Sequence, residues 1–293
     1  MLHYTKVRIL TFLLLLALAL GAREPLAKRI SHTDPAKYRA AKAVHGGPGQ
    51  LDYMSILDAH SLDTNLFFLH RGILQPKSGI GAHFHNQCEE MFVIFDGEAQ
   101  FTIDGRTSVL KGPAGAPVRM GHSHAIYNHT DKPVQWMNIN VSAMKGTYDA
   151  FDLADPRIDV QIDPIPVFMS IRFDRTLLRP APGKGAVQYR RLLAPTVFSG
   201  PWAYVDHLLL SPNSSTSPHL HTEVAEFYYV MKGKGAVTVN SETSPIQEGD
   251  AIPIQLNEAH SFDNTGADPL EFLIVGVSRD NTRRVDQVEV PAR

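Results

Sequence analysis

Cysteine is nearly absent from this sequence of 293 residues, in which Cys88 is the single example. One cysteine cannot form an intrachain disulfide, so the fold does not rest on a disulfide framework. Closed structural zinc sites usually recruit several cysteines, which this chain does not have. Cys88 lies between His85 and Glu90 and is a candidate thiolate ligand; a buried cysteine that binds no metal is the alternative.

An excess of charge of one sign is also lacking, since the formal net charge is −2. This balance provides no basic surface for nucleic acid, and we expect no nucleic-acid partner. Long helical periodicity is missing as well. From residue 50 onward, short apolar runs alternate with Gly, Pro, Asn and Asp, which predicts an all-β antiparallel sandwich or barrel. The expected strands include residues 66–74, 90–95, 99–103 and 136–141.

Residues 1–22 have the pattern of a signal peptide. Lys6 and Arg8 precede an apolar run at 9–20, which ends in small residues. A single membrane anchor is the alternative, but the run is shorter than the ~20 residues that a membrane span needs. We therefore expect an exported protein, periplasmic or secreted, with no membrane attachment after cleavage.

Three other segments lack the strand pattern. Residues 23–49 are mixed and polar and are expected to form a surface arm or a lead-in strand, with room for a short helix at 36–44. Residues 143–185 are rich in aspartate and proline, which is typical of a connecting segment. The polar tail after Asp280 is expected to be loose.

The two halves of the chain are related by a constant offset of 136 residues. This offset joins His83 to His219, Glu90 to Glu226 and His124 to His260, without insertion or deletion. The repeat predicts two β-domains, at residues 50–145 and 186–281, joined by a linker at 146–185.

The repeat also selects among neighbouring candidate ligands. Cys88 is matched by Val224, Glu89 by Ala225 and His122 by Glu258, so none of these three belongs to a shared set. The residues common to both halves are His83, His85, Glu90 and His124 in the first, and His219, His221, Glu226 and His260 in the second.

Three imidazoles and one carboxylate suit a divalent transition-metal ion. An octahedral ion with four protein ligands keeps two positions for water, oxygen or a chelating substrate. The alternative is that buried histidines only satisfy hydrogen bonds, but two matching sets of four favour metal binding.

These motifs resemble a known family. His-x-His, four residues, Glu, six residues, Gly, and then a distant Pro and His-x-x-x-Asn resemble the two motifs of the cupin superfamily, and two copies resemble a bicupin. The resemblance implies two tandem cupin barrels (double-stranded β-helices, or jelly rolls). It also implies one divalent metal ion in each, held by the eight residues above. Manganese or iron is favoured, with nickel, cobalt and zinc also open.

Strand alternation predicts the other side chains that face each ion. They would form a largely apolar substrate pocket, suited to a flat or aromatic substrate, although ordinary core packing is the alternative. Arg119, present only in the first copy, is a candidate partner for an anionic substrate, or else a solvated surface arginine. The predicted pocket residues are Phe92, Ile94, Ile126, Tyr228, Val230 and Phe262, with Arg119.

Bicupins with this ligand set resemble quercetinase-like dioxygenases and oxalate decarboxylases. In a dioxygenase, the ligands Glu90 and Glu226 are candidate catalytic residues that accept a substrate proton. A decarboxylase needs a carboxylate on a lid, and residues 143–185 contain aspartates but no glutamate. Our leading hypothesis is therefore an exported metal-dependent dioxygenase-type oxidoreductase acting on a small phenolic or enolic chelator.

Three alternatives stay open: an oxalate-decarboxylase-like lyase, an isomerase for a small oxyacid or sugar, and a non-catalytic binding bicupin. The expected partner is a small molecule, and a homo-oligomer is compatible with the sequence. Metal identity, substrate, the number of active sites and the role of residues 143–185 stay open.

Overall fold

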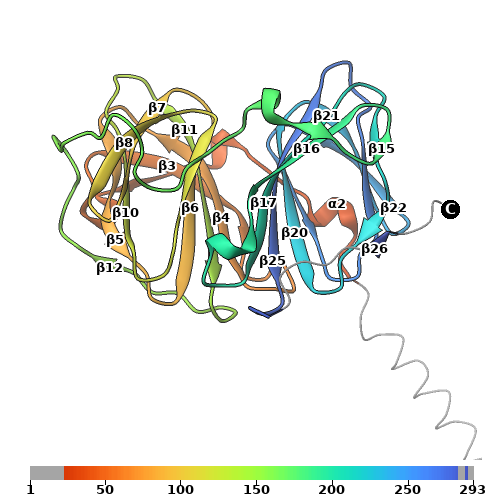
Figure 1. Cartoon of the computed structure of the whole chain (residues 1–293), viewed down its shortest axis with the longest axis horizontal. Coiled ribbons are helices and arrows are strands. Elements are labelled where there is room, and N and C mark those ends of the chain that lie inside the picture. The colour runs from red at the N-terminus through yellow and green to blue at the C-terminus, as the bar shows by residue number, and fades with distance from the viewer. Residues whose placement is uncertain (1–22, 283–287, 290–293) are drawn as a thin grey trace, which may run out of the picture.

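The computed structural model describes residues 23–282 and 288–289. The predicted signal peptide at 1–22 therefore lies outside the described residues. Two β-barrels stand side by side in this part of the chain (Figure 1), which confirms the all-β prediction. None of the helices in the described ranges has the length and apolar character needed to cross a membrane.

Barrel one is formed by two facing sheets. The larger contains, in spatial order, β13 (Ile171–Arg172), β9 (Ala114–Val118), β6 (Cys88–Ile94), β11 (Val134–Ser142), β4 (Leu66–Leu74), β3 (Gln50–Asp58) and β2 (Arg39–Lys42). The smaller contains β12 (Phe151–Asp152), β5 (Ser78–Phe84), β10 (Ser123–Asn128), β7 (Glu98–Ile103) and β8 (Arg106–Lys111). All the strand pairs are antiparallel, and the strands predicted from apolar runs are present as β4, β6, β7 and β11.

Barrel two repeats this plan. One sheet contains β1 (Ser31–His32), β23 (Asp250–Ile254), β20 (Val224–Lys232), β25 (Leu270–Ser278), β17 (Trp202–Leu210), β16 (Val187–Leu193) and β14 (Arg179–Pro180). The other contains β15 (Gly183–Lys184), β18 (Ser215–Thr216), β24 (His260–Asp263), β19 (His219–Leu220) and β26 (Val288–Glu289), with β21 (Lys234–Val239) joined to β24 and β22 (Glu242–Gln247) joined to β21.

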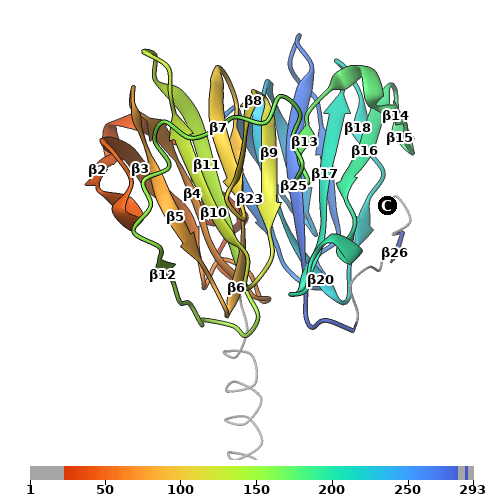
Figure 2. The same ribbon diagram turned by 60° about the vertical axis from the view of Figure 1, so that its left-hand side comes forward.

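Alternating side chains divide the apolar residues into barrel interiors and a shared interface. On β6, Phe92 and Ile94 lie in the interior of barrel one, whereas Met91 and Val93 face barrel two. On β20, Tyr228 points into barrel two and Phe227 joins the same interface. Because side chains on a strand alternate between its faces, every second residue packs inside its own barrel, and the residues between them pack at the interface of the two barrels. Figure 2 shows the two barrels after a turn of 60° about the vertical axis of Figure 1.

The N-terminal arm, residues 23–49, crosses from one barrel to the other. Its helix α2 (Leu26–Arg29) inserts Leu26, 1% exposed, into the core of barrel two, and β1 pairs with β23 there. Further along, β2 pairs with β3 of barrel one. The short helix considered for 36–44 is wrong: a 3-10 turn at Pro35–Lys37 precedes β2, because hydrogen bonding to β3 competes successfully with local helix formation.

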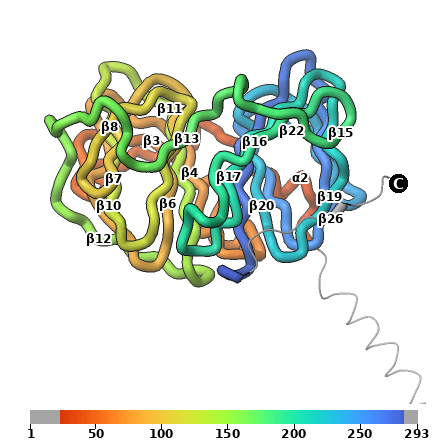
Figure 3. The backbone as a smooth tube through the Cα atoms, viewed as in Figure 1, coloured from red at the N-terminus to blue at the C-terminus, as the bar shows by residue number. Residues whose placement is uncertain are grey.

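The linker and the tail also pair with the barrels. The linker runs from barrel one to barrel two (Figure 3), pairing through β12 and β13 with the first and through β14 and β15 with the second. The tail after Asp280 was expected to be loose, but β26 within it pairs with β19. Asp152 of β12 is the backbone partner of His83, and Glu289 of β26 is the partner of His219.

Candidate metal centres

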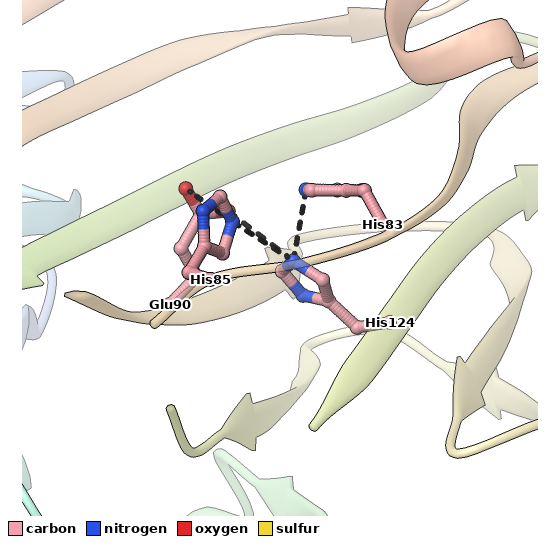
Figure 4. Close-up of side chains that lie close together, drawn as sticks. All are labelled: His83, His85, Glu90 and His124. Atoms are coloured by element: carbon pink, nitrogen blue, oxygen red, sulfur yellow. Dashed lines mark hydrogen bonds and ion pairs between the residues drawn. The ribbon is translucent and has the colours of Figure 1, made fainter. Parts of the chain in front are cut away.

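Site one is the cluster of His83, His85, Glu90 and His124 inside barrel one (Figure 4). His83 on β5 and His124 on β10 are direct cross-strand partners, so their side chains lie together. His85 follows the end of β5, and Glu90 reaches the cluster from β6 in the facing sheet. Each of the four residues is 1% exposed.

The donor atoms of site one converge on a common point. The Nε2 atom of His124 lies 2.9 Å from that of His83 and 3.4 Å from that of His85. Carboxylate oxygens of Glu90 lie 3.5 Å from His85 Nε2 and 3.7 Å from His124 Nε2. One donor atom from each residue fits within a group no wider than 4.8 Å. This is the arrangement that a bound cation requires.

The tautomers of the histidines suit metal binding. His83 donates its Nδ1 proton to the Gly81 carbonyl at 2.9 Å, and His85 donates its own to the Asp149 carbonyl. These bonds leave the lone pairs of both rings on Nε2, where the four residues meet. The structure thus orients the imidazoles from outside the cluster.

Two asparagines hold the carboxylate of Glu90. Asn140 Nδ2 donates to Oε1 at 2.8 Å and Asn138 Nδ2 donates to Oε2 at 3.0 Å. Burial, followed by the neighbouring His45, lowers the pKa of His83 to about 2, and burial with the nearby imidazoles keeps the pKa of His124 far below 6.5. These imidazoles are neutral, which is the form that binds a metal.

Segments outside the repeat enclose site one. His45 of the N-terminal arm stacks on His83 with a centroid distance of 3.7 Å, and its Nδ1 lies 2.5 Å from Asp152 Oδ1 of the linker. Phe92 stacks on His124 with ring centroids 4.7 Å apart, so it lies beside the site as predicted. Ile94 and Ile126 belong to the surrounding core.

Site two is the matching cluster of His219, His221, Glu226 and His260 in barrel two. His219 and His260 are again cross-strand partners. Glu226 Oε2 lies 3.2 Å from His260 Nε2 and 3.4 Å from His221 Nε2. The donor atoms again fit within 4.8 Å. Both sets predicted from the repeat are therefore brought together, and each fits one metal ion.

The orientation of the ligands in site two follows the same rule. His219 Nδ1 donates to the Ser217 carbonyl and His260 Nδ1 to the Glu258 carbonyl, both at 3.0 Å. Burial lowers the pKa of His219 to about 4. For Glu226, burial alone would raise the pKa, but the surrounding histidines hold it well below its usual range. Site two is thus a carboxylate among imidazoles, a donor set suited to a divalent transition metal.

Tyrosines replace the asparagines in site two. Tyr204 donates its hydroxyl to Glu226 Oε1 at 2.6 Å, and the Tyr228 hydroxyl lies 3.3 Å from Oε2 and 3.2 Å from His260 Nε2. Burial raises the pKa values of Tyr204 and Tyr228 well above 10, so both remain phenols that donate hydrogen bonds. A Cβ atom at Gly276 would lie 2.5 Å from the ring of Tyr204, so this glycine provides the space for it.

The offset of 136 residues explains why these partners were missed. Asn140 of barrel one corresponds to Gly276, and Asn138 corresponds to Ile274. Selecting only residues that recur in both halves excludes the residues by which the two sites differ. The signal was present in the sequence as the loss of both asparagines from the second half.

A cavity of about 480 Å³ opens onto site two. Tyr228 lines it, as predicted, whereas Val230 and Phe262 pack in the core of barrel two without lining it. His219, unlike the ligands of site one, is partly exposed. The lining residues are Ala181, Pro182, Val187, Tyr189, Arg191, Tyr204, Asp206, Leu208, Thr216, Ser217, His219, His221, Glu226, Tyr228 and Ile274.

Arg119 does not lie at site one. It follows the end of β9, and its guanidinium donates to the backbone carbonyls of Val197 and Thr196. These carbonyls belong to the connection between β16 and β17 of barrel two. The arginine therefore contacts the neighbouring barrel, and its predicted pairing with a substrate in the first site is wrong.

Cys88 and Glu89 lie outside the cluster of four residues that forms site one. Burial raises the pKa of Cys88 to about 12, so this fully buried sulfur is a thiol, and Asn140 Nδ2 lies 3.1 Å from it. Glu89 points to the opposite face of β6, where it accepts hydrogen bonds from the backbone N–H groups of Ser199 and Gly200, both at 2.8 Å. Both assignments agree with the repeat.

Comparison with known proteins gives consistent results. A cupin domain profile matches residues 70–140 and 207–276. An oxalate-binding protein of Thermotoga maritima is 36% identical over 93 residues, which are 32% of this chain and 77% of that protein. The uncharacterised protein MJ1618 of Methanocaldococcus jannaschii is 28% identical over 103 residues, 35% of this chain and 82% of that protein.

Two solved enzymes share the arrangement of the barrels. Oxalate decarboxylase of Bacillus subtilis superposes with a TM-score of 0.63 at 16% identity, covering 92% of this chain and 79% of that one. Salicylate 1,2-dioxygenase of Pseudoaminobacter salicylatoxidans gives a TM-score of 0.62 at 16% identity, covering 77% and 73%. At such identities the likeness shows the fold alone.

Proposed function

Because the chain belongs to the cupin family and carries a cupin domain in each half, we propose that it is a metal-dependent oxidoreductase of the dioxygenase type. It acts at site two on a small phenolic or enolic substrate that chelates the ion. Export to the periplasm or the exterior is part of the proposal, supported by the sequence of residues 1–22. The partner is a small molecule.

The cavity at site two is the observation that carries this proposal. Its volume of about 480 Å³ lies within the range of roughly 300–1,000 Å³ that is common for small-molecule sites. Its walls include the rings of Tyr189, Tyr204 and Tyr228 and the aliphatic side chains of Val187 and Leu208. Such a space suits a ring-sized organic molecule better than a two-carbon dianion.

The residues of site two have distinct proposed roles. His219, His221, Glu226 and His260 hold a divalent ion, with manganese or iron favoured. When bound, the ion supplies Lewis acidity to the chelating oxygens of the substrate. Glu226 is the acceptor for the hydroxyl proton of the substrate, and Tyr204 keeps its carboxylate in position through the 2.6 Å hydrogen bond.

Site one provides the corresponding set with Glu90 as the candidate proton acceptor. All four of its ligands are buried, and His45 and Asp152 cover His83. We therefore assign substrate turnover to site two. An ion in site one contributes to the stability of barrel one, since it joins strands from both of its sheets.

Binding or decarboxylation of oxalate, or of a similar small oxyacid, is the second candidate function. The 36% identity to an oxalate-binding protein favours it. Residues 143–185 contain aspartates but no glutamate that could act as a lid carboxylate, which counts against decarboxylation.

Oxygen consumption by the metal-reconstituted chain tests the proposal. We expect oxygen uptake with flavonols or catechols, its loss in His219→Ala and its retention in the matched site-one variant His83→Ala. Release of carbon dioxide from oxalate without oxygen uptake on any aromatic substrate would instead establish the second candidate. Loss of uptake only in His83→Ala would move the active site to barrel one.

A further inference from the structure

Barrel two carries an arginine that the repeat does not provide. Val187, Tyr189 and Arg191 on alternate positions of β16 line the cavity at site two. The corresponding residue in barrel one is Ser55, so Arg191 is a feature of the second site alone. It is also the only lysine or arginine among the residues that line this cavity.

Asp206 fixes the guanidinium of Arg191 from one side. The Nε atom lies 3.1 Å from Asp206 Oδ1 and Nη2 lies 3.2 Å from Oδ2. Tyr189 donates its hydroxyl to the same carboxylate at 2.7 Å, and Asp206 is 3% exposed. The guanidinium carbon also lies 4.3 Å from the centroid of the Tyr204 ring. These contacts set both the position and the plane of the guanidinium.

The edge of the guanidinium that faces away from Asp206 has N–H groups that Asp206 does not use. A guanidinium carries five N–H groups, and the contacts with Asp206 use Nε and Nη2 on one edge. In the described part of the chain, Nη1 takes no part in the contacts with Asp206. The side chain is 34% exposed and lines the cavity. The Nη1–Nη2 edge therefore presents two parallel N–H groups, the geometry that binds a carboxylate with both oxygens.

Tyr204 sets the separation between this edge and the metal ligands. One face of its ring lies against Arg191, whereas its hydroxyl bonds Glu226 of site two at 2.6 Å. The guanidinium and the ligand carboxylate thus contact the same phenol, the first over its ring and the second at its hydroxyl. A ring-sized ligand in this cavity can therefore contact the guanidinium and the metal ligands together.

We propose that Arg191 binds a carboxylate of the substrate while the other end of the substrate chelates the ion in site two. The substrate class is then a small catechol-type or enol-type carboxylic acid, with the acid and the chelating oxygens at opposite ends of a ring-sized skeleton. This inference rests on the proposed function in one respect, which is that the other end of the substrate chelates the metal ion.

Binding of two matched ligands to the metal-loaded full chain tests it. The probes are 3,4-dihydroxybenzoate and its neutral counterpart 3,4-dihydroxybenzamide, titrated by calorimetry without oxygen. A charge-assisted pair of hydrogen bonds predicts that the acid binds about tenfold or more tightly than the amide. Arg191→Gln removes this preference and leaves amide binding within about twofold. Arg190→Gln makes the same charge change on the other face of β16 and keeps the preference.

A second variant separates recognition from folding. Arg191→Gln leaves the buried Asp206 carboxylate without its cationic partner, so the double variant Arg191→Gln/Asp206→Asn removes the ion pair together and is expected to lose the same preference. Equal affinities for acid and amide in the native chain, equal weakening of both by Arg191→Gln, or no binding of either would overturn the proposal. Acid preference without oxygen uptake on any substrate would instead contradict the proposed reaction and leave the role of Arg191 standing.

Discussion

Replacing Glu89 with glutamine should destabilise the protein without removing a metal ion. Glu89 and Glu90 are neighbours on β6 and point to opposite faces of that strand. Glu90 belongs to site one, whereas Glu89 is fully buried between the barrels, where it accepts hydrogen bonds from Ser199 and Gly200. Substitutions at these two adjacent positions therefore test the structural role of a buried carboxylate and the binding of a metal ion separately.

The hydrogen bonds that Glu89 accepts from Ser199 and Gly200 determine the size of the effect. In Glu89→Gln one oxygen remains, but the new amide NH₂ group faces a backbone N–H and cannot accept from it. One charge-assisted bond is lost, a buried N–H loses its partner and the other bond weakens. We expect the free energy of unfolding to fall by about 2–4 kcal/mol.

Urea denaturation of the chelator-treated protein at pH 7.5 measures this loss, and elemental analysis after reconstitution measures the metal. Glu89→Gln should keep an ion at both sites. Glu90→Gln, its matched control, should lose affinity at site one, because an anionic ligand becomes neutral. A Glu89→Gln protein with native stability and an empty site one would refute the assignment of the two glutamates.

Three further predictions concern other parts of the chain. Burial lowers the pKa of His70 from 6.5 to about 4, so between these pH values the unfolded chain binds a proton that the folded chain does not, and stability falls as the pH falls through this range. His70→Phe, which can stack on Phe68 as His70 does, should lose less stability in urea titrations between pH 7 and 4.5; equal losses would contradict this. Leu26→Ala should lower the free energy of unfolding by about 2–4 kcal/mol, and native stability would mean that the N-terminal arm does not pack on barrel two. Cys88 should resist iodoacetamide at pH 8 until the chain is unfolded, as followed by mass spectrometry, whereas rapid modification of the native protein would contradict its burial.

Strand alternation and the repeat explain what could be predicted from the sequence. The offset of 136 residues identified both ligand sets, since a duplicated site retains the same residues at the same spacing. The two-residue period of a strand then placed Phe92 and Tyr228 beside them. Strand alternation concerns neighbouring residues of one strand, and the repeat compares equivalent positions of two similar domains.

The remaining features depend on contacts between distant segments. His45 reaches His83 through the crossing of the N-terminal arm, and the pairing of β12 with β5 brings Asp152 beside both. No local pattern predicts such a meeting. Arg119 shows the same limit, because it lies past the end of its strand, where alternation no longer predicts where a side chain points.

The repeat could not predict how the two sites differ, because it selects only the residues that both halves share. Tyr204 occupies space that Gly276 leaves open, and Arg191 lies on a strand position with no charged counterpart in barrel one. A comparison that retains only shared residues finds the metal ligands. The residue that we propose to recognise the substrate, Arg191, is among those that differ between the copies.

The most direct test of two independent metal centres is elemental analysis of the purified chain with one histidine removed from each site in turn. The native protein should bind two ions per chain, one for each set of four donors. His124→Ala and His260→Ala should each retain one ion, and the double variant should retain none. Loss of both ions from either single variant, or native metal content in the double variant, would contradict the two-centre account.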